Sequence, residues 1–329
     1  IAFRVPIPSS AFLFHQMPDL LLSEQPLPPV ANTVAQQTEL HGETRVDPYA
    51  WLRERENPEV TAYLEAENAY TAAMLKHTES LQEGLYKEML GRIKEDDSQV
   101  PVKRDGWFYY SRTEKGKAYP IFCRRRTSPE SPEEVYFDQN AAAKDHKFFQ
   151  LGGFEVSPDH NYLALLEDTN GYEDFVLKVL DLRTGRYLAD RIEKLGFGLA
   201  WASDNRTLFY MTTDSAKRGD QVWRHRLGDE HAKDASVYRD SDILFNVGVG
   251  RTRSGDWIVL QSGSFTSGET WVLDANHPEA KPRLVAKRAA NVEYDVAHGG
   301  SWFYLVTNRD GAKNFKVMRA PVSDPGRWE

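Results

Sequence analysis

The sequence has very little cysteine, no long apolar run and no excess of positive charge. Its single cysteine, Cys123, excludes a disulfide within the chain and favours a reducing compartment. Nowhere do about 18 apolar residues follow one another, so we expect no transmembrane helix and no membrane partner. The 329 residues carry a net charge of −8, and nucleic-acid-binding domains are usually basic, which argues against a nucleic-acid partner. These absences predict a cytoplasmic protein rather than a periplasmic one.

The spacings of metal and phosphate sites are also absent from the sequence. The nine histidines form neither H-E-x-x-H nor a paired metal-ligand spacing. His225 and His231 lie six residues apart, and we interpret them as strand and loop residues rather than ligands. No glycine-rich phosphate loop follows a strand, so we expect no cofactor and no metal. Asn205-Arg206-Thr207 has the form of a glycosylation site, but we interpret it as a turn.

What the sequence does contain is a pattern of short strands and tight turns, clearest between Gly153 and Leu188. Turn-forming residues cluster at Ser157–Asn161 and again at Asp181–Gly185, where a glycine can adopt positive φ. Apolar runs of strand length lie between these turns. An isolated antiparallel meander of this size cannot bury its own apolar face, so the pattern must repeat or pack against something else.

The pattern does repeat, because an apolar run after a polar turn occurs five times. The runs are Trp107–Tyr110, Tyr162–Leu165, Leu208–Tyr210, Trp257–Leu260 and Trp302–Leu305. After each run we expect a second strand, at Ile121–Arg125, Phe175–Leu182, Val222–Leu227, Trp271–Asp274 and Phe315–Arg319. The units begin about 45 to 55 residues apart, which is the period of a propeller blade. We therefore predict a mainly β fold, a partial β-propeller over residues 96–329, with a β-sandwich or another all-β fold as the alternative.

Before the strands the sequence predicts two other segments. Residues 1–40 show no periodicity and are rich in proline, serine and glutamine, so we expect a poorly ordered tail. Residues 41–95 are expected to be helical. Asn57 followed by Pro58 is a helix start, and Val60, Leu64 and Met74 belong to an apolar stripe at near-helical spacing. A second helix is expected over about residues 81–93, and both helices need an apolar surface to lie against.

Several short motifs resemble one family. The segments Arg45–Arg53 (RVDPYAWLR) and Tyr63–Asn68 (YLEAEN) resemble the N-terminal signature of the prolyl oligopeptidase family of serine peptidases. Similarity to the oligopeptidase B branch lies in GRIK at Gly91–Lys94, in Val100-Pro101, in GKAYPI at Gly116–Ile121 and in Arg124-Arg125. The resemblance covers roughly residues 42–329, and the combination of motifs is more specific than any one of them.

The resemblance implies a larger enzyme. In that family a helical N-terminal segment packs on an α/β-hydrolase domain, a seven-bladed propeller follows, and the hydrolase domain comes last. Its oligopeptidase B branch cuts short peptides after Arg or Lys. We therefore expect about five of the seven blades here, with a missing C-terminal hydrolase domain as partner and short basic peptides as substrates of the whole enzyme.

No catalytic residue is expected in this chain. The family's nucleophilic serine needs small residues on both sides of a strained turn. Ser301 follows Gly299 and Gly300 but is followed by Trp302, and the loop Gly263–Gly268 holds no serine with glycines at the required offsets. The resemblance places the Ser-Asp-His triad, and the acidic residues that recognise the substrate Arg or Lys, in the missing domain.

The resemblance further implies that the propeller covers the active site, admits only short peptides and gates access as the domains open and close. Glu155 is our single candidate for an inter-domain contact, because it lies just ahead of the turn at Ser157-Pro158-Asp159, where a carboxylate could reach a neighbouring domain. A solvated or locally paired Glu155 is the alternative. We interpret the basic run Arg124–Arg126 as a solvated strand end rather than a binding patch.

Two other functions are open from the sequence. A stand-alone propeller could serve as a protein or peptide interaction module, but five units with open edges and two unpartnered helices argue against it. A small-molecule-binding propeller enzyme would need a convergent set of titratable residues, which the sequence does not show. We therefore predict the N-terminal segment and propeller portion of an oligopeptidase-B-like serine peptidase, non-catalytic by itself.

Overall fold

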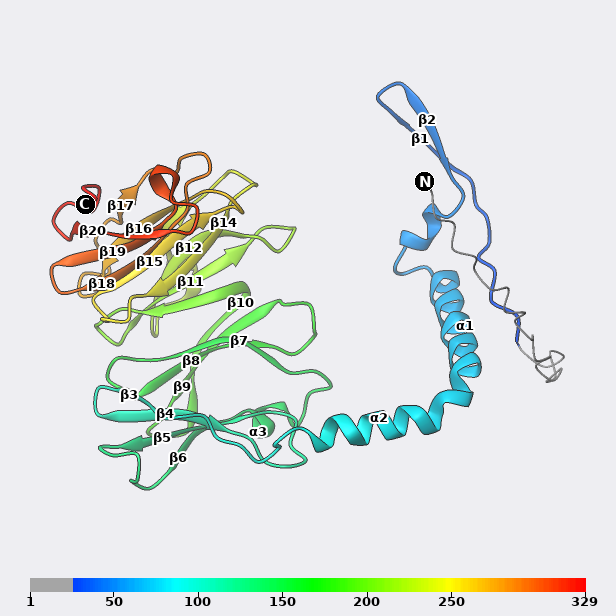
Figure 1. Ribbon diagram of the computed structural model, residues 1–329, viewed down its shortest axis with the longest axis horizontal. Coiled ribbons are helices and arrows are strands. Elements are labelled where there is room, and N and C mark those ends of the chain that lie inside the picture. Colours follow the sequence, from blue (N-terminus) through cyan, green and yellow to red (C-terminus); the bar gives the residue numbers. More distant parts are fainter. Residues whose placement is uncertain (1–25) are drawn as a thin grey trace, which may run out of the picture. The chain divides into compact units, whose positions relative to one another are not determined.

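The computed structural model describes residues 26–329, which form two compact units (Figure 1). The first unit ends at Lys94, and the second comprises Glu95–Glu329. A hairpin and two helices make up most of the first unit, whereas the second is built almost wholly of strands. None of the helices in this part of the chain is long and apolar enough to cross a membrane.

The first unit begins with an antiparallel hairpin of β1 (Gln36–Leu40) and β2 (Glu43–Asp47). His41 and Gly42 join the two strands, and both have positive φ, 56° and 81°. Two successive residues of this kind make the turn whose twist matches that of the flanking strands. β1 therefore lies inside the segment 1–40 that we expected to be a poorly ordered tail. Residues 1–25 of that segment lie outside the described part of the chain.

Both predicted helices are present. α1 (Pro58–Leu75) begins where the sequence placed it, because the Asn57 side chain accepts a hydrogen bond of 3.0 Å from the backbone N–H of Glu59. Pro58 occupies the first turn, where its missing N–H costs nothing. α2 (Glu79–Gly91) begins and ends two residues before the predicted segment 81–93.

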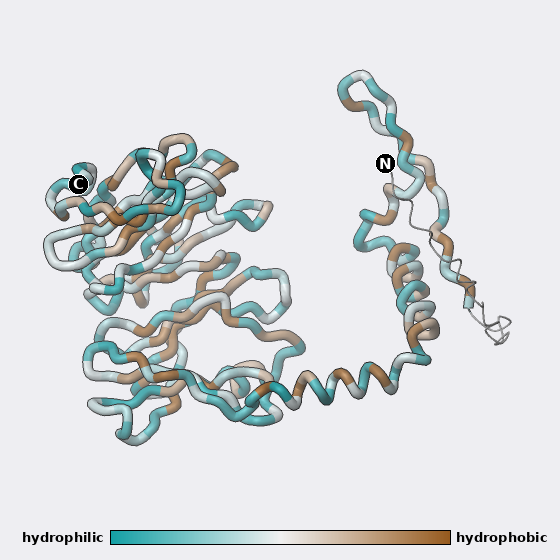
Figure 2. Tube along the Cα trace, in the orientation of Figure 1, coloured by the Kyte–Doolittle hydropathy of each residue, from teal (hydrophilic) through white to brown (hydrophobic). Residues whose placement is uncertain are grey.

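These helices leave much apolar surface open. Among residues 26–94, the buried ones are Ala50, Trp51 and Val60. Apolar side chains that are about half exposed or more recur along both helices and past the end of α2, and they include Leu64, Leu81, Leu85, Met89 and Ile93 (Figure 2). An apolar helix face of this kind is stable only against a further apolar surface.

The second unit is a series of five antiparallel blades, which confirms the predicted β-propeller fold. Blade I comprises β3 (Val102–Arg104), β4 (Trp107–Arg112), β5 (Ile121–Arg126) and β6 (Glu134–Asp138). A short helix, α3 (Gln139–Ala143), leads to blade II, which comprises β7 (Gln150–Val156), β8 (Tyr162–Asp168), β9 (Phe175–Asp181) and the first part of β10 (Arg186–Trp201).

The other three blades repeat this order. Blade III comprises the second part of β10 with β11 (Thr207–Thr213), β12 (Gly219–Arg226) and β13 (Ala235–Arg239). Blade IV comprises β14 (Asn246–Arg251), β15 (Trp257–Gly263), β16 (Gly268–Asp274) and β17 (Arg283–Ala286). Blade V has three strands, β18 (Tyr294–Gly299), β19 (Trp302–Thr307) and β20 (Lys316–Pro321).

The long strand β10 belongs to two blades. Its first part pairs with β9 as the outer strand of blade II, and its second part pairs with β11 as the inner strand of blade III. The register shifts between these parts, where Lys194 and Gly198 have positive φ (60° and 126°). A side chain at Gly198 would lie 3.2 Å from the Val249 carbonyl of blade IV. Glycine therefore allows β10 to change blades and pass close to β14.

Apolar cores lie between successive blades. Phe209 and Tyr210 are neighbours on β11 and are both fully buried, yet they belong to different cores. Tyr210 packs with Phe175 and Leu177 of blade II, and Phe209 packs with Ile258 of blade IV. Alternate residues of a strand point to opposite faces, and both faces of these blades are covered. This double burial explains why the predicted strands have continuous apolar sequences rather than alternating ones.

All ten predicted strand segments overlap strands of the structure, and they are the second and third strands of the five blades. Most of the first and fourth strands were not predicted. Their sequences are mixed, as in NVGVGR of β14 and YDVAHG of β18. These strands face the axis or the outside of the unit, so their sequences need no continuous apolar run. Cys123 of β5 is fully buried, and burial raises the pKa of its thiol to about 11.

Candidate functional site

Glu155 lies near the carboxyl end of β7 and has a partner inside the propeller unit. Its carboxylate is 3.9 Å from the guanidinium of Arg104, the last residue of β3, and its side chain is 47% exposed. The surrounding blades nevertheless bury it enough to raise its pKa, an effect that Arg104 and Arg251 oppose. Glu155 is thus the local counter-ion of an arginine, and its inter-domain role stays a prediction.

Arg251, the last residue of β14, completes this charged group at the carboxyl ends of the inner strands. Its guanidinium donates to the Gly255 carbonyl at 2.7 Å and to the Ser203 hydroxyl at 3.0 Å. Burial lowers the pKa of Arg251, and the positive charge of Arg104 lowers it further. Asp256, Glu155 and Asp105 oppose this lowering, so charges from different blades meet here, which sequence spacing could not reveal.

The basic run Arg124–Arg126 is not a solvated strand end, contrary to our expectation. Arg124 is only 5% exposed, and its guanidinium lies over the Trp107 ring with 4.2 Å to the ring centroid. It donates to the His160 carbonyl at 2.7 Å and pairs with Glu134 at 2.5 Å. Only the third member of the run, Arg126, is exposed. Packing of a guanidinium against an aromatic ring makes such burial favourable.

His225 and His231 do not form a metal site, but they share a carboxylate. Asp234 lies 2.7 Å from Nδ1 of His225, 2.9 Å from Nδ1 of His231, and accepts a hydrogen bond of 2.8 Å from the Tyr210 hydroxyl. Asp190, from the outer strand of blade II, lies 3.0 Å from Nε2 of His225. Within residues 26–329 no group of three or more His, Cys, Asp or Glu side chains is placed to hold a metal ion.

This network joins blade II to blade III through His225. His225 is 1% exposed, and both ring nitrogens face carboxylates. Both contacts are hydrogen bonds only when the ring carries two protons. Burial alone would lower the pKa of His225, but the hydrogen bonds to Asp190 and Asp234 outweigh it and raise that pKa. The sequence does not reveal this network, because Asp190 is 35 residues from His225 and no local motif marks it.

In the loop Gly263–Gly268, which was considered for a nucleophile, the serine hydroxyls contact each other and the loop backbone rather than a histidine. Ser264 and Ser267 bond each other in the loop between β15 and β16, with 3.3 Å between their hydroxyl oxygens. One serine that the sequence analysis did not consider, Ser254, lies 2.8 Å from Nδ1 of His298, and Asp256 lies 3.4 Å from the same nitrogen. A catalytic triad needs the serine and the aspartate on opposite ring nitrogens, so this group is not one.

The glycosylation-like segment is part of the turn between β10 and β11. Asn205 has φ 58°, and its side-chain oxygen accepts a hydrogen bond of 2.8 Å from the backbone of Asp159. Thr207 is 3% exposed and donates to Asp204 at 2.7 Å. The polar side chains of the segment are thus engaged in holding the turn.

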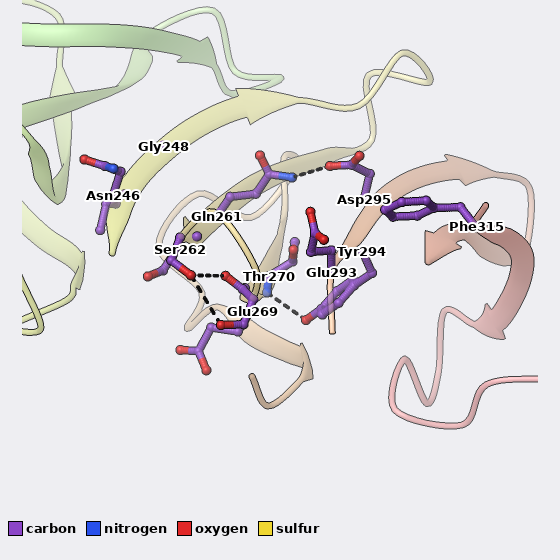
Figure 3. A pocket seen from close by; sticks show the side chains of 15 residues that line it. Asn246, Gly248, Gln261, Ser262, Glu269, Thr270, Glu293, Tyr294, Asp295 and Phe315 are labelled. Carbon is purple, nitrogen blue, oxygen red and sulfur yellow. Dashed lines mark hydrogen bonds between the residues drawn. The ribbon is translucent and has the colours of Figure 1, made fainter. Parts of the chain in front are cut away.

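A cavity of about 400 Å³ lies between blades IV and V (Figure 3). Gln261 and Glu269 line it from blade IV, and Glu293, Asp295 and Phe315 line it from blade V. Gln261 extends across the gap and donates to Asp295 at 3.4 Å, as Figure 3 shows. Carboxylates from both blades and an aromatic ring thus line the cavity, and the sequence marks none of these residues as part of a site.

Comparison with known proteins gives a family match and several relatives. Residues 28–329 match the family "Prolyl oligopeptidase, N-terminal beta-propeller domain". Protease 2 of Moraxella lacunata is 33% identical over 303 residues, which are 90% of this chain and 44% of that protein. Dipeptidyl aminopeptidase BI of Pseudoxanthomonas mexicana is 37% identical over 305 residues, 87% of this chain and 42% of that protein. The chain thus spans less than half the length of these curated relatives.

Solved structures agree with this match. Oligopeptidase B from Leishmania major superimposes with a TM-score of 0.84 and 28% identity over 92% of this chain and 46% of that one. Oligopeptidase B from Trypanosoma brucei, in a closed form with covalently bound antipain, gives 0.82 and 30% over 92% of this chain and 45% of that one. Because nearly all of the sequence matches one defined domain and the fold agrees, this chain belongs to the prolyl oligopeptidase family and carries its N-terminal β-propeller domain.

Proposed function

We propose that this chain is the N-terminal and propeller portion of a serine-type oligopeptidase similar to oligopeptidase B, which cleaves short peptides after Arg or Lys. The observation that carries the proposal is the likeness to two oligopeptidase B structures over 92% of the chain, at TM-scores of 0.84 and 0.82. The chain covers less than half of each of those proteins. Acyl transfer by a Ser-His-Asp triad would take place in a C-terminal hydrolase domain.

In this proposal the propeller restricts the substrates by size. The cores between blades are fully buried, so a blade cannot move aside without exposing apolar surface to water. Peptides would reach the active site through the movement of whole domains, which is a usual way to gate access. The open apolar side chains of α1 and α2 would pack on the hydrolase domain, and Glu155 would make an inter-domain contact.

The proposal is tested with a fluorogenic substrate that carries two arginines before the cleavage site and a blocked amino terminus. The 329-residue chain is assayed alone and after mixing with a separately expressed hydrolase domain. We expect no hydrolysis from the chain alone and hydrolysis on mixing. Activity of the purified chain by itself would show that it holds a nucleophile and would overturn the proposal.

A second candidate specificity comes from the relative named dipeptidyl aminopeptidase BI, which is 37% identical. An enzyme that removes dipeptides must bind the free amino group of its substrate, so a blocked amino terminus would abolish cleavage. Comparing the blocked substrate with the same peptide carrying a free amino group separates the two specificities. Cleavage of both favours the oligopeptidase, and cleavage of the free form alone favours the aminopeptidase.

A further inference from the structure

The cavity between blades IV and V opens on one defined face of the propeller unit. It is lined by the first residues of β14, by the loop between β15 and β16, and by residues at the start of β18. In blade I the position equivalent to the loop after β15 is the loop after β4. Thr113, the first residue of that loop, donates its backbone N–H to the Asp97 carbonyl, so the residues just after Glu95 lie at this end of blade I. The cavity therefore lies on the face where the chain from the first unit joins the propeller, which we call the amino-end face.

Two carboxylates in this cavity have no cationic partner among residues 26–329. Glu293 accepts from the Asn308 amide at 3.3 Å and Asp295 accepts from the Gln261 amide at 3.4 Å. The third carboxylate, Glu269, is different because Arg288 lies 3.3 Å away and neutralises it. Neutral amides contact Glu293 and Asp295 without cancelling their charge, so two negative charges line the cavity.

An aromatic ring lines the same cavity. Phe315 is 43% exposed and is held just before β20 by a backbone in the left-handed region, with φ 61°. Phe315 and Asp295 both line the cavity and are both labelled in Figure 3. Planar guanidinium groups bind where carboxylates can accept from their forked N–H groups and an aromatic ring can stack on their face. A compact ammonium group would use only the charge.

We propose that this cavity binds the guanidinium group of an arginine side chain in a peptide substrate. Glu293 and Asp295 accept its N–H groups, and Phe315 packs against its face. The volume of about 400 Å³ accommodates the aliphatic stem as well as the charged head. The statement that the arginine belongs to a peptide substrate rests on the proposed function, whereas the statement that the cavity binds a guanidinium group does not. Such a site would add a preference for a second basic residue, apart from the one after which cleavage occurs.

The direct test measures binding of N-acetyl-arginine amide to the immobilised 329-residue chain, with the lysine and citrulline amides as comparisons. Citrulline has the same shape without the charge. We expect arginine to bind more tightly than lysine and at least about tenfold more tightly than citrulline, because hydrogen bonds to charged groups are the strong ones. The double variant Glu293→Gln/Asp295→Asn should lose that preference, since its amides keep the shape and lose the charge.

A matched control removes two carboxylates elsewhere. Glu230→Gln/Asp324→Asn changes the net charge equally, and neither residue lines the cavity. We expect arginine binding to survive in this control, and a thermal melt of each variant shows that it is folded. Phe315→Ala provides an independent variant and should also weaken arginine binding. Equal binding of arginine and citrulline, or equal loss in the control, would overturn the proposal.

These experiments distinguish failure of the guanidinium site from failure of the proposed function. If arginine binding depends on Glu293 and Asp295 but the mixed domains do not cleave the Arg-Arg substrate, the site stands and the proposed substrate class falls. If the mixture cleaves that substrate and the double variant binds arginine like the wild type, the site is wrong and the proposed function stands.

Discussion

At Gly219 the backbones of blades III and IV come too close for any side chain. A Cβ at this position would lie 2.3 Å from the Val247 carbonyl oxygen and 2.5 Å from the Met211 sulfur. The methionine can move but the carbonyl belongs to the β14 backbone. The absence of a side chain at Gly219 therefore allows the two blades to pack this closely. Gly219 does not have positive φ, so no turn motif in the sequence indicates its role.

Gly219→Ala should therefore destabilise the propeller. We expect a loss of about 1–3 kcal/mol in the free energy of unfolding, the usual cost of overpacking, measured by denaturant titration. Gly250→Ala is the matched control, since this glycine lies on β14 with nothing within 4 Å of a Cβ. Its effect should stay within about 1 kcal/mol. Equal losses in both variants would contradict the close approach.

Glu155 supports a second prediction at this scale. Its ion pair with Arg104 is long, at 3.9 Å, and half exposed, so it contributes about 0–1 kcal/mol to stability. Glu155→Gln should leave the melting temperature of the chain nearly unchanged but weaken its association with the hydrolase domain severalfold. Glu230→Gln is the control for loss of one charge. Unchanged association in Glu155→Gln would rule out the inter-domain contact.

At the scale of elements, the link between blades II and III depends on a proton. Asp190 on β10 and Asp234 before β13 face the two ring nitrogens of the buried His225 of β12, while His231 and Tyr210 bond the same Asp234. A neutral imidazole can donate to only one of the two carboxylates. Loss of the proton would therefore leave one buried carboxylate without its donor and loosen the contact between the blades.

The propeller should lose stability as the pH rises above the ordinary histidine pKa of about 6.5 and passes the raised native pKa of His225. The native pKa of His225 is raised, so its contribution is complete below the unfolded value of about 6.5 and is lost as the pH passes the native pKa. The pKa of Asp190 is lowered, and its contribution is lost only in acid. Unfolding free energies across this range should fall less in His225→Asn than in the wild type.

His277→Gln is the matched control for this pH dependence, because His277 contacts a carboxylate through one nitrogen only and its side chain is 75% exposed. It should keep the slope of the wild type. If His225→Asn also keeps that slope, the buried histidine is not the source of the pH dependence.

How much the sequence predicts differs between kinds of element. Strands such as β8 and β11 were predictable because both of their faces are buried, which requires an unbroken apolar run. The start of α1 was predictable because a cap and a proline are local signals. β1 was not, since all five of its residues are exposed and it is held by backbone pairing with β2, which leaves no apolar pattern in the sequence.

At the scale of the whole molecule, two kinds of apolar surface remain open. One lies along α1 and α2 and continues to Ile93, two residues after α2. The other consists of exposed side chains of the propeller unit such as Ile243, Leu244 and Phe265. Phe265 lies in the loop that borders the cavity. The recurrence of exposed apolar side chains along the helices indicates a partner surface. In the proposed enzyme the hydrolase domain would cover them.

The isolated chain should therefore bind an apolar dye and tend to self-associate. Leu85→Gln/Met89→Gln should lower dye fluorescence without lowering the melting temperature, because both side chains are about half exposed. The control Glu83→Gln/Lys87→Gln removes only a surface ion pair of 2.9 Å on the same helix. A monomeric chain that melts cooperatively and binds no dye would contradict this prediction.

The sequence by itself determined the blade period, the second and third strands of each blade and the family, because double burial and short motifs are local in the chain. Only the tertiary structure decided which charges meet. Glu155 lies beside Arg104, His225 between Asp190 and Asp234, and the cavity carboxylates beside Phe315. These groups come from different strands or blades, so their separation in sequence carries no signal, and only the packing of strands and blades brings them together.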